Sequence, residues 1–141
     1  MPTDVFLDTN VLVYAAYPLA GEKAKQRAAL DLMERERFAV SSQVLLEFLN
    51  ITTRKRKPPL PLTEAHAWLE DFCVANVVGV DQSVVGEGVD LAARYKIVFW
   101  DGAILAAARR SGATKLYTED LNDGQRYGDV VVINPFKQAN T

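Results

Sequence analysis

The chain has 141 residues, of which 49% are hydrophobic and 24% charged, and a formal net charge of -2. This is the size and composition of one globular domain, and the charge excludes binding to nucleic acid through overall charge alone. We predict a single domain over residues 1–136 and a short C-terminal tail over residues 137–141. The single cysteine, Cys73, excludes an internal disulfide, and its neighbours Phe72 and Val74 predict a buried thiol.

The sequence gives no indication of a targeting or membrane segment. The first residues do not combine a basic stretch with an apolar one, and no apolar run approaches the ~18 residues that a membrane span needs. An unpaired cysteine also suits a reducing compartment. We therefore expect a cytoplasmic protein with no membrane partner.

The first dozen residues combine a short apolar run with the start of a helix. Residues 5–7 predict a buried strand, and the helix-period stretch over residues 11–16 predicts a helix. Asp8 lies at the junction, at the edge where parallel α/β sheets place their ligands. The simpler interpretation is that Asp8 or Asn10 only caps the helix by accepting a backbone N–H.

A second strand and a strongly apolar helix follow. The pattern predicts an amphipathic helix over residues 22–37, a strand over residues 38–40 and a helix over about residues 43–55. Apolar side chains cover most of the last helix, and Glu47 lies among them. A carboxylate in that position is unfavourable unless it is paired, bound to a metal or able to reach water. A boundary glutamate that reaches solvent is the simpler interpretation.

A basic run, Arg54, Lys55, Arg56 and Lys57, ends that helix in front of Pro58. Cations in a last helical turn oppose the negative end of the helix dipole, and proline prevents the helix from continuing. The run therefore has a structural explanation. It is also the only dense basic stretch of the chain, and close to an acidic site it would contact the phosphates of a ligand.

Two more helices and a strand are predicted in the middle of the chain. A helix over about residues 64–75 would be capped by Thr63, and a strand would follow over residues 77–80. The next helix would begin at an aspartate cap and run over residues 81–95. His66, the only histidine, has no second histidine or cysteine at ligand spacing, which argues against a zinc site.

Further acidic residues lie in the C-terminal third. Asp101 stands at the N-terminus of an alanine-rich helix, where an aspartate is also a favoured cap. A strand over residues 115–118 ends on Glu119 and Asp120, and Asp123 follows closely.

The alternation of strands and helices, closed by a strand over residues 130–133, predicts an α/β sandwich with a largely parallel sheet. The carboxyl ends of such strands share one edge, so we expect Asp8, Glu47, Asp101 and Asp120 to converge there. Crowded carboxylates repel one another unless a cation joins them, and hard oxygen ligands select Mg²⁺ or Mn²⁺. We therefore predict a site for metal-assisted phosphoryl transfer, with these four acids as its catalytic residues.

These features resemble the PIN domain, and more narrowly the VapC-type toxin ribonucleases of prokaryotic toxin–antitoxin pairs. The resemblance covers essentially the whole chain and depends on the order and spacing of four motifs: Asp8-Thr9-Asn10, Glu47, Trp100-Asp101 and Thr118-Glu119-Asp120. It implies a three-layer α/β/α sandwich with a mostly parallel central sheet. It also implies a cytoplasmic endoribonuclease dependent on Mg²⁺ or Mn²⁺, usually a homodimer, with RNA as substrate and an antitoxin partner that blocks the site.

The resemblance also assigns roles to residues of this chain. It implies that Asp8 and Asp101 are the main metal ligands and that Glu47 and Asp120 complete the acidic site. Asn10 would orient Asp8.

One position departs from the family pattern. The resemblance gives Thr118 a supporting role in holding water or substrate, and family members often have a further aspartate two residues after the position of Asp120. This chain has Asn122 there, and Asp123 would substitute for it. The sequence leaves open whether Asp120 or Asp123 is the fourth acid.

Two other functions match part of the sequence. A non-catalytic PIN-like module that binds RNA or protein would act through its partner or through residues 54–57, without turnover. A phosphatase that uses Asp8 as a covalent nucleophile matches less well, because sites of the haloacid dehalogenase type resemble D-x-D and this chain has Asn10 at the second position.

Overall fold

The structure is a computed structural model, and it describes residues 3–137. Of the predicted tail over residues 137–141, residues 138–141 lie outside the described residues. The described part forms one six-stranded sheet in the order β3-β2-β1-β4-β6-β5, and only β5 pairs antiparallel to its neighbour. The strands are β1 (Val5–Leu7), β2 (Phe38–Ser41), β3 (Asn76–Val78), β4 (Lys115–Tyr117), β5 (Arg126–Tyr127) and β6 (Val130–Ile133).

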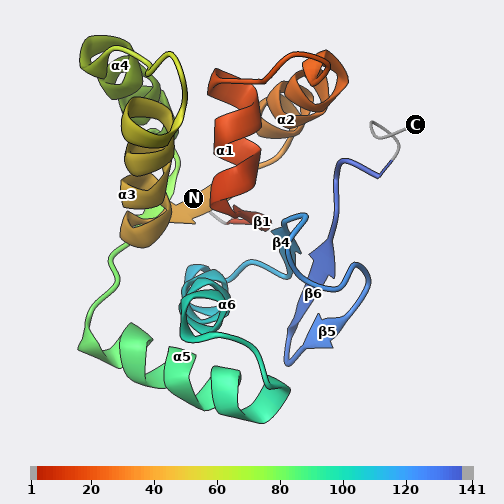
Figure 1. The fold of residues 1–141 in the computed structure, drawn as a ribbon. Helices are drawn as coiled ribbons and strands as arrows, with labels where there is room; N and C mark the ends of the chain where they lie inside the picture. Colours follow the sequence, from red (N-terminus) through yellow and green to blue (C-terminus); the bar gives the residue numbers. More distant parts are fainter. Residues whose placement is uncertain (1–2, 138–141) are drawn as a thin grey trace.

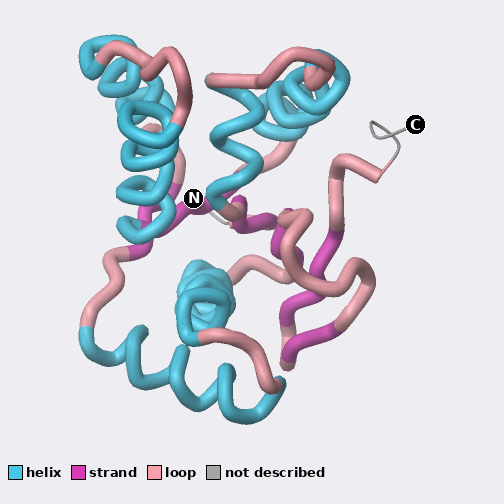
Figure 2. Tube along the Cα trace, in the orientation of Figure 1, coloured by secondary structure: helices cyan, strands magenta, loops and turns pink. Residues whose placement is uncertain are grey.

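The helices cover both faces of this sheet. They are α1 (Thr9–Ala16), α2 (Lys23–Arg35), α3 (Ser42–Asn50) with the π-helical turn η1 (Ile51–Lys55), α4 (Leu62–Phe72), α5 (Gln82–Tyr95) and α6 (Phe99–Ser111). Helices α1 to α4 lie on one side of the sheet, and α5 and α6 lie on the other (Figures 1 and 2). The predicted three-layer α/β/α sandwich with a mostly parallel sheet is confirmed. Between residues 3 and 137, none of the helices combines the length and the apolar character that crossing a bilayer requires.

The central strand β1 shows why the sequence favours this fold. All of its residues are buried, and Phe6 and Leu7 have no exposed surface, because helices cover both faces of the sheet. On the side of the sheet that carries α1 to α4, helix α3 packs on α4 through an edge-to-face contact between Phe48 and Phe72, with ring centroids 5.0 Å apart. The continuous apolar run of β1 therefore reflects a position in the middle of the core.

Three local predictions are wrong. Helix α4 begins at Leu62, with Pro61 at the N-cap instead of Thr63, and the carbonyl of Pro61 accepts the first helical hydrogen bond, from the backbone N–H of Ala65 at 3.0 Å. Cys73 is exposed, because α4 ends at Phe72 and it is this neighbour that packs into the core. Strand β5 was not predicted, since two residues are too few to show an alternating pattern.

Two glycines allow the backbones of α5 and α6 to meet. A Cβ atom on Gly102 would clash with the carbonyl oxygen of Gly88, and a Cβ atom on Gly88 would lie 2.9 Å from the Cα of Ala103. The contact lies in the first turns of α6, next to Asp101. It therefore fixes the position of this acidic residue relative to the rest of the fold.

We expect Gly102→Ala to lower the free energy of unfolding by roughly 1–3 kcal/mol, because the added methyl group meets backbone that has no room to move. The matched control is Gly86→Ala in α5, where an added Cβ atom meets open space. That change should raise the stability by about 0.5–1 kcal/mol through helix propensity. Urea denaturation measures both, and a gain of stability in both variants would contradict the close packing.

Candidate functional site

A hollow of about 470 Å³ contains all four acids that were predicted to converge. Asp8 follows β1, Asp120 follows the neighbouring parallel strand β4, Glu47 lies in α3 and Asp101 lies in the first turn of α6. Each side chain lines the hollow. The topology of the sheet therefore gathers carboxylates that are far apart in the sequence.

Asp8 is the most buried of these acids, with 6% of its surface exposed. Its Oδ1 accepts the backbone N–H of Thr9 at 2.7 Å, and its Oδ2 accepts the hydroxyl of Thr118 at 2.8 Å. Burial raises the pKa of Asp8 to about 7, against the lowering effect of these two hydrogen bonds, and the carboxylates of Asp120 and Glu47 raise it further. Asp8 therefore caps α1 and also lines the acidic hollow, so its role as a cap does not exclude it from the candidate site.

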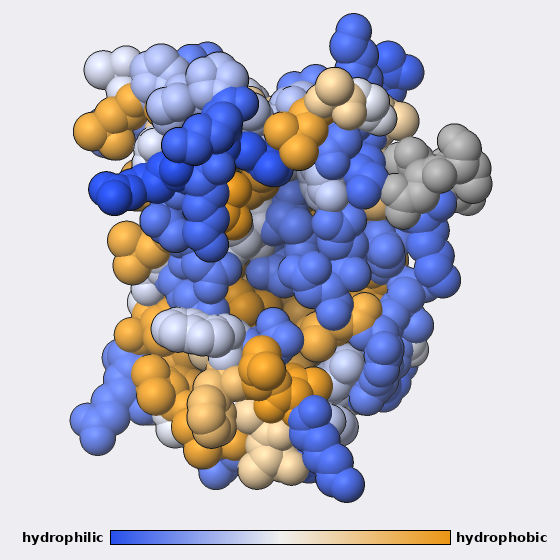
Figure 3. Space-filling view, viewed as in Figure 1, coloured by the Kyte–Doolittle hydropathy of each residue, from blue (hydrophilic) through white to orange (hydrophobic). Residues whose placement is uncertain are grey.

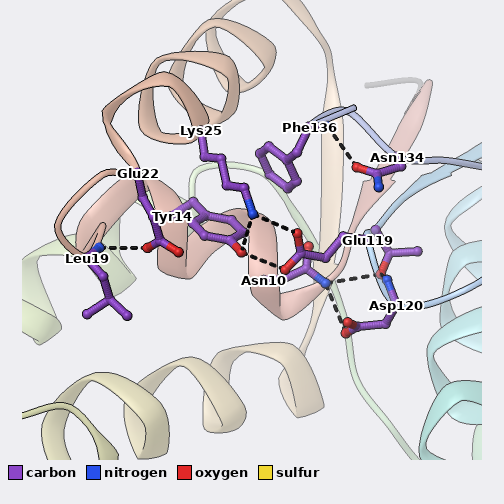
Figure 4. A network of polar contacts seen from close by, with 10 residues as sticks. Asn10, Tyr14, Leu19, Glu22, Lys25, Glu119, Asp120, Asn134 and Phe136 are labelled. Atoms are coloured by element: carbon purple, nitrogen blue, oxygen red, sulfur yellow. Dashed lines mark hydrogen bonds and ion pairs between the residues drawn. The ribbon is translucent and has the colours of Figure 1, made fainter. Parts of the chain in front are cut away.

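Thr118 and Asn10 connect Asp8 to Asp120. The fully buried hydroxyl of Thr118 donates to Asp8 and accepts from the Asn10 side-chain amide and from the Asp120 backbone N–H, both at 3.1 Å. The same amide group of Asn10 also donates to Oδ2 of Asp120 at 3.1 Å (Figure 4). Asn10 thus reaches Asp8 through Thr118. Its own Oδ1 is buried and has no hydrogen-bond partner among residues 3–137.

Two residues that the sequence analysis missed hold Glu47 in the hollow. The hydroxyl of Thr9 donates to its Oε2 at 2.7 Å, and the side-chain amide of Gln43 donates to its Oε1 at 3.0 Å. Gln43 stands one helical turn before Glu47, and this i,i+4 spacing was the available signal. The half-buried carboxylate is therefore oriented by two donors and is more than a boundary residue that reaches solvent.

Asp101 is the third residue of α6, three positions after its N-cap. The helix begins at Phe99, with Val98 at the N-cap, so the interpretation of Asp101 as a capping residue is wrong. The side chain is half-buried and lines the hollow. Burial raises its pKa, and the carboxylates of Asp120 and Glu47 raise it further. Asp101 thus shares one electrostatic environment with the other acids.

The four acids of the hollow are not paired with basic side chains in the described part of the protein. No Lys, Arg or His of residues 3–137 forms an ion pair with Asp8, Glu47, Asp101 or Asp120. Within the same residues, no three Asp, Glu, His or Cys side chains converge tightly enough to hold an ion by themselves. Mg²⁺ is typically held by one or two carboxylates and keeps several waters. The oxygen donors, including the unpartnered Oδ1 of Asn10, therefore fit a largely hydrated Mg²⁺ or Mn²⁺.

The structure places Asp123 away from this site. Its Oδ1 accepts the backbone N–H of Asn134 at 2.7 Å, and its Oδ2 pairs with Lys137 at 2.8 Å, which lowers its pKa. Among the described residues that line the hollow, Asp120 is present and Asp123 is absent. Of the two candidates for the fourth acid, Asp120 is the one that lines the hollow together with Asp8, Glu47 and Asp101.

The first two residues of the basic run, Arg54 and Lys55, lie in the turn η1, and Arg56 and Lys57 follow it. The backbone N–H of Arg56 donates to the carbonyl of Ile51 at 3.0 Å, the wider spacing of a π turn, and such turns are frequent at functional sites. Within residues 3–137, Arg56 is the only member of the run that lines the acidic hollow, and its buried Nε has no partner. Lys55 lines an adjoining hollow, whereas Arg54 and Lys57 are exposed and line neither.

Glu119 lines the hollow, but its carboxylate is bound to α1 and α2. It accepts the hydroxyl of Tyr14 at 2.6 Å and pairs with Lys25 at 3.5 Å, and Lys25 donates to the Tyr14 hydroxyl at 3.1 Å (Figure 4). The ring of Phe136 packs against Tyr14 with centroids 4.8 Å apart. Burial and the adjacent Glu119 raise the pKa of Tyr14. The network anchors the loop that carries Asp120.

We expect Glu119→Ala to lower the free energy of unfolding by roughly 1–3 kcal/mol, because it leaves two partly buried polar groups, the Tyr14 hydroxyl and the Lys25 ammonium, without a carboxylate. Asp4→Ala is the matched control, since Asp4 forms an exposed ion pair with Arg37. Its removal should cost less than about 1 kcal/mol. Chemical denaturation at pH 7 compares the two, and equal losses would contradict an anchoring role for Glu119.

The fold and the hollow define a doubly wound α/β protein with an acidic site at the carboxyl edge of its parallel strands. The profile of the PIN domain family matches residues 5–127, a segment that contains all four acids of the hollow. The chain therefore belongs to the PIN domain family. A comparison with curated proteins finds no significant match.

Solved structures share this fold at low sequence identity. A chain of a toxin–antitoxin complex from Klebsiella pneumoniae is 20% identical, with 94% of this chain and 98% of that chain covered and a TM-score of 0.69. The sarcin-ricin loop cleaving toxin VapC20 of Mycobacterium tuberculosis is 20% identical, with coverage of 83% and 92% and a TM-score of 0.65. A chain of VapBC2 from Rickettsia felis, solved bound to a DNA fragment from the promoter, is 19% identical. The comparison covers 91% of this chain and 96% of that chain, with a TM-score of 0.61. At these identities the likeness establishes the fold.

Proposed function

We propose that this protein is an endoribonuclease that depends on a divalent metal ion. The observation that carries the proposal is the hollow in which Asp8, Glu47, Asp101 and Asp120 meet, none of them in an ion pair with a Lys, Arg or His of the described residues. Asp8 and Asp101 would hold Mg²⁺ or Mn²⁺. Such an ion, when bound, supplies Lewis acidity toward a phosphodiester and lowers the pKa of water.

The remaining residues of the site prepare it for a phosphodiester. Two hydrogen bonds hold Asp8 in one orientation, and Thr9 and Gln43 do the same for Glu47. Glu47 and Asp120 complete the acidic wall, and as carboxylates they accept a proton from an attacking water. Arg56, on the wall of the same hollow, offers a guanidinium to a phosphate oxygen.

The test is to incubate the purified protein with single-stranded and structured RNAs, with Mg²⁺, with Mn²⁺ and with a chelator. We expect cleavage in the presence of metal, none with the chelator, and recovery when excess metal is added back. Cleavage that persists in the chelator would contradict the mechanism. Binding of RNA without turnover under every condition would instead support the non-catalytic module.

We also propose that the protein is the toxin of a toxin–antitoxin pair, cytoplasmic and homodimeric. Support comes from membership of the PIN family and from the similar fold of chains solved as toxin–antitoxin complexes. The partner should be a small protein encoded by a neighbouring reading frame. Co-expression of that protein should relieve any growth arrest and inhibit the nuclease in vitro. Growth that is unaffected by the wild-type protein would contradict the toxin assignment.

A further inference from the structure

Trp100 is a large aromatic side chain that the core does not use. It is 71% exposed in the first turn of α6, yet its backbone is fixed, because its carbonyl accepts the side-chain amide of Gln43 at 3.2 Å. The same amide holds Glu47. The backbone that carries the exposed indole is thus bound by the same group that orients one of the acids.

The indole stands between two hollows. One is the acidic hollow, and the other, of about 350 Å³, is lined by Glu47, Asn50, Ile51, Lys55 and Trp100. Glu47, Ile51 and Trp100 line both, so they form a shared wall. A ligand that occupies the second hollow therefore ends next to the acids of the first.

The lining of the second hollow has the groups that recognise a nucleotide. Trp100 offers a flat face on which a base can stack, and the exposed Asn50 amide offers a donor and an acceptor to a base edge. The exposed ammonium of Lys55 offers a charge to a phosphate. Ile51 adds an apolar side chain to the lining of the same hollow.

We propose that this second hollow binds the base of an unpaired nucleotide of the RNA substrate, with the base stacked on Trp100 and the adjoining phosphodiester presented to the acidic hollow. The inference rests on the proposed ribonuclease function and adds to it a binding hollow for one base beside the acids. A base inside a duplex has no free face to stack, so a continuous double helix is excluded from this hollow.

A protein partner is the competing explanation for an exposed tryptophan. Val98 and Phe99 are exposed beside it, and apolar side chains gather over the part of the surface where Figure 1 places α5 and α6 (Figure 3). The observations favour RNA because the hollow also contains an ammonium and an amide and shares a wall with the acids. A purely apolar docking surface requires none of these groups.

The experiment measures binding separately from cleavage. A dye-labelled single-stranded RNA hexamer is titrated with protein, with a chelator present and at low salt, and anisotropy gives the Kd. We expect Trp100→Ala to raise the Kd roughly 5- to 150-fold and Trp100→Phe to raise it much less, because stacking needs an aromatic face. Phe99→Ala is the matched control: Phe99 is 67% exposed but, within residues 3–137, lines neither hollow, so the Kd should change less than about twofold.

Two further measurements identify the bound group. The chain has two tryptophans, so Trp68→Phe leaves Trp100 as the only indole, and its emission should be quenched by the hexamer. An abasic hexamer with the same phosphates, and the same RNA in a duplex, should quench less and bind more weakly.

The outcomes separate this inference from the proposed function. An unchanged Kd for Trp100→Ala, or equal affinity for the abasic hexamer, would overturn the base-binding hollow even if RNA is cleaved. Weaker binding by Trp100→Ala in a protein that never cleaves RNA would leave the hollow standing and refute the nuclease. Emission of Trp100 that changes with protein concentration but not with RNA would assign the indole to a protein interface and overturn the inference.

Discussion

Asp101→Asn is expected to slow RNA cleavage by roughly 100- to 1000-fold while the fold is kept. The carboxylate lines the acidic hollow and has a raised pKa, but it does not cap α6, so its loss removes charge from the site and leaves the helix intact. Single-turnover rates with enzyme in excess, in Mg²⁺ and in Mn²⁺, measure the effect. Circular dichroism should show an unchanged helix content.

Asp90→Asn is the matched control for this prediction. Asp90 is an exposed aspartate of α5 that lines neither the acidic hollow nor its neighbour in the described chain, so the cleavage rate should stay within about twofold. The pair Asp120→Asn and Asp123→Asn then identifies the fourth acid, and Asp120→Asn should give the larger loss. A full cleavage rate for Asp101→Asn would show that the acidic hollow is not the site of the chemistry.

Without a divalent ion, the protein is expected to become less stable as the pH rises. Asp8 has a pKa of about 7 in the folded protein against 3.8 as the ordinary value, so the folded state favours its protonated form. The resulting stabilisation is complete below pH 3.8 and is lost as the pH rises through about 7. A shift of this size corresponds to at most roughly 4 kcal/mol, and the raised pKa of Asp101 acts in the same direction.

Asp8→Asn isolates this effect. In the presence of a chelator, the variant should gain stability relative to wild type as the pH rises from 4 to 8, because asparagine has no charge to bury. Added Mg²⁺ at pH 8 should stabilise the wild type and have little effect on the variant. Urea denaturation at several pH values measures both. Parallel stability curves for the two proteins would be inconsistent with a raised pKa at Asp8.

Much of the acidic site was predictable because its residues follow from local patterns. Asp8 ends a continuous apolar strand, and Asp120 follows another strand of the same parallel sheet. Glu47 is conspicuous as a carboxylate in an otherwise apolar helix, and Asp101 opens an alanine-rich one. Since parallel strands share one carboxyl edge, the alternation of elements was enough to predict that these acids meet.

The remaining features depend on contacts between distant parts of the chain. Asp123 follows the same strand as Asp120, but its carboxylate is bound by Lys137 and by the backbone N–H of Asn134 instead of lining the hollow. No local pattern indicates that Thr9 would donate to Glu47 across 38 positions, or that the carbonyl of Trp100 would be bound by Gln43. These contacts orient Glu47 and fix the backbone of Trp100.

The central claim is that carboxylates from separate elements hold one divalent cation. Titration of Mn²⁺ into the purified protein, followed by calorimetry, tests it directly. We expect the wild type to bind Mn²⁺, and Asp8→Asn and Asp101→Asn each to weaken that binding by at least about tenfold. Equal affinity of the wild type and both variants, or no binding of Mn²⁺ by the wild type, would contradict the account.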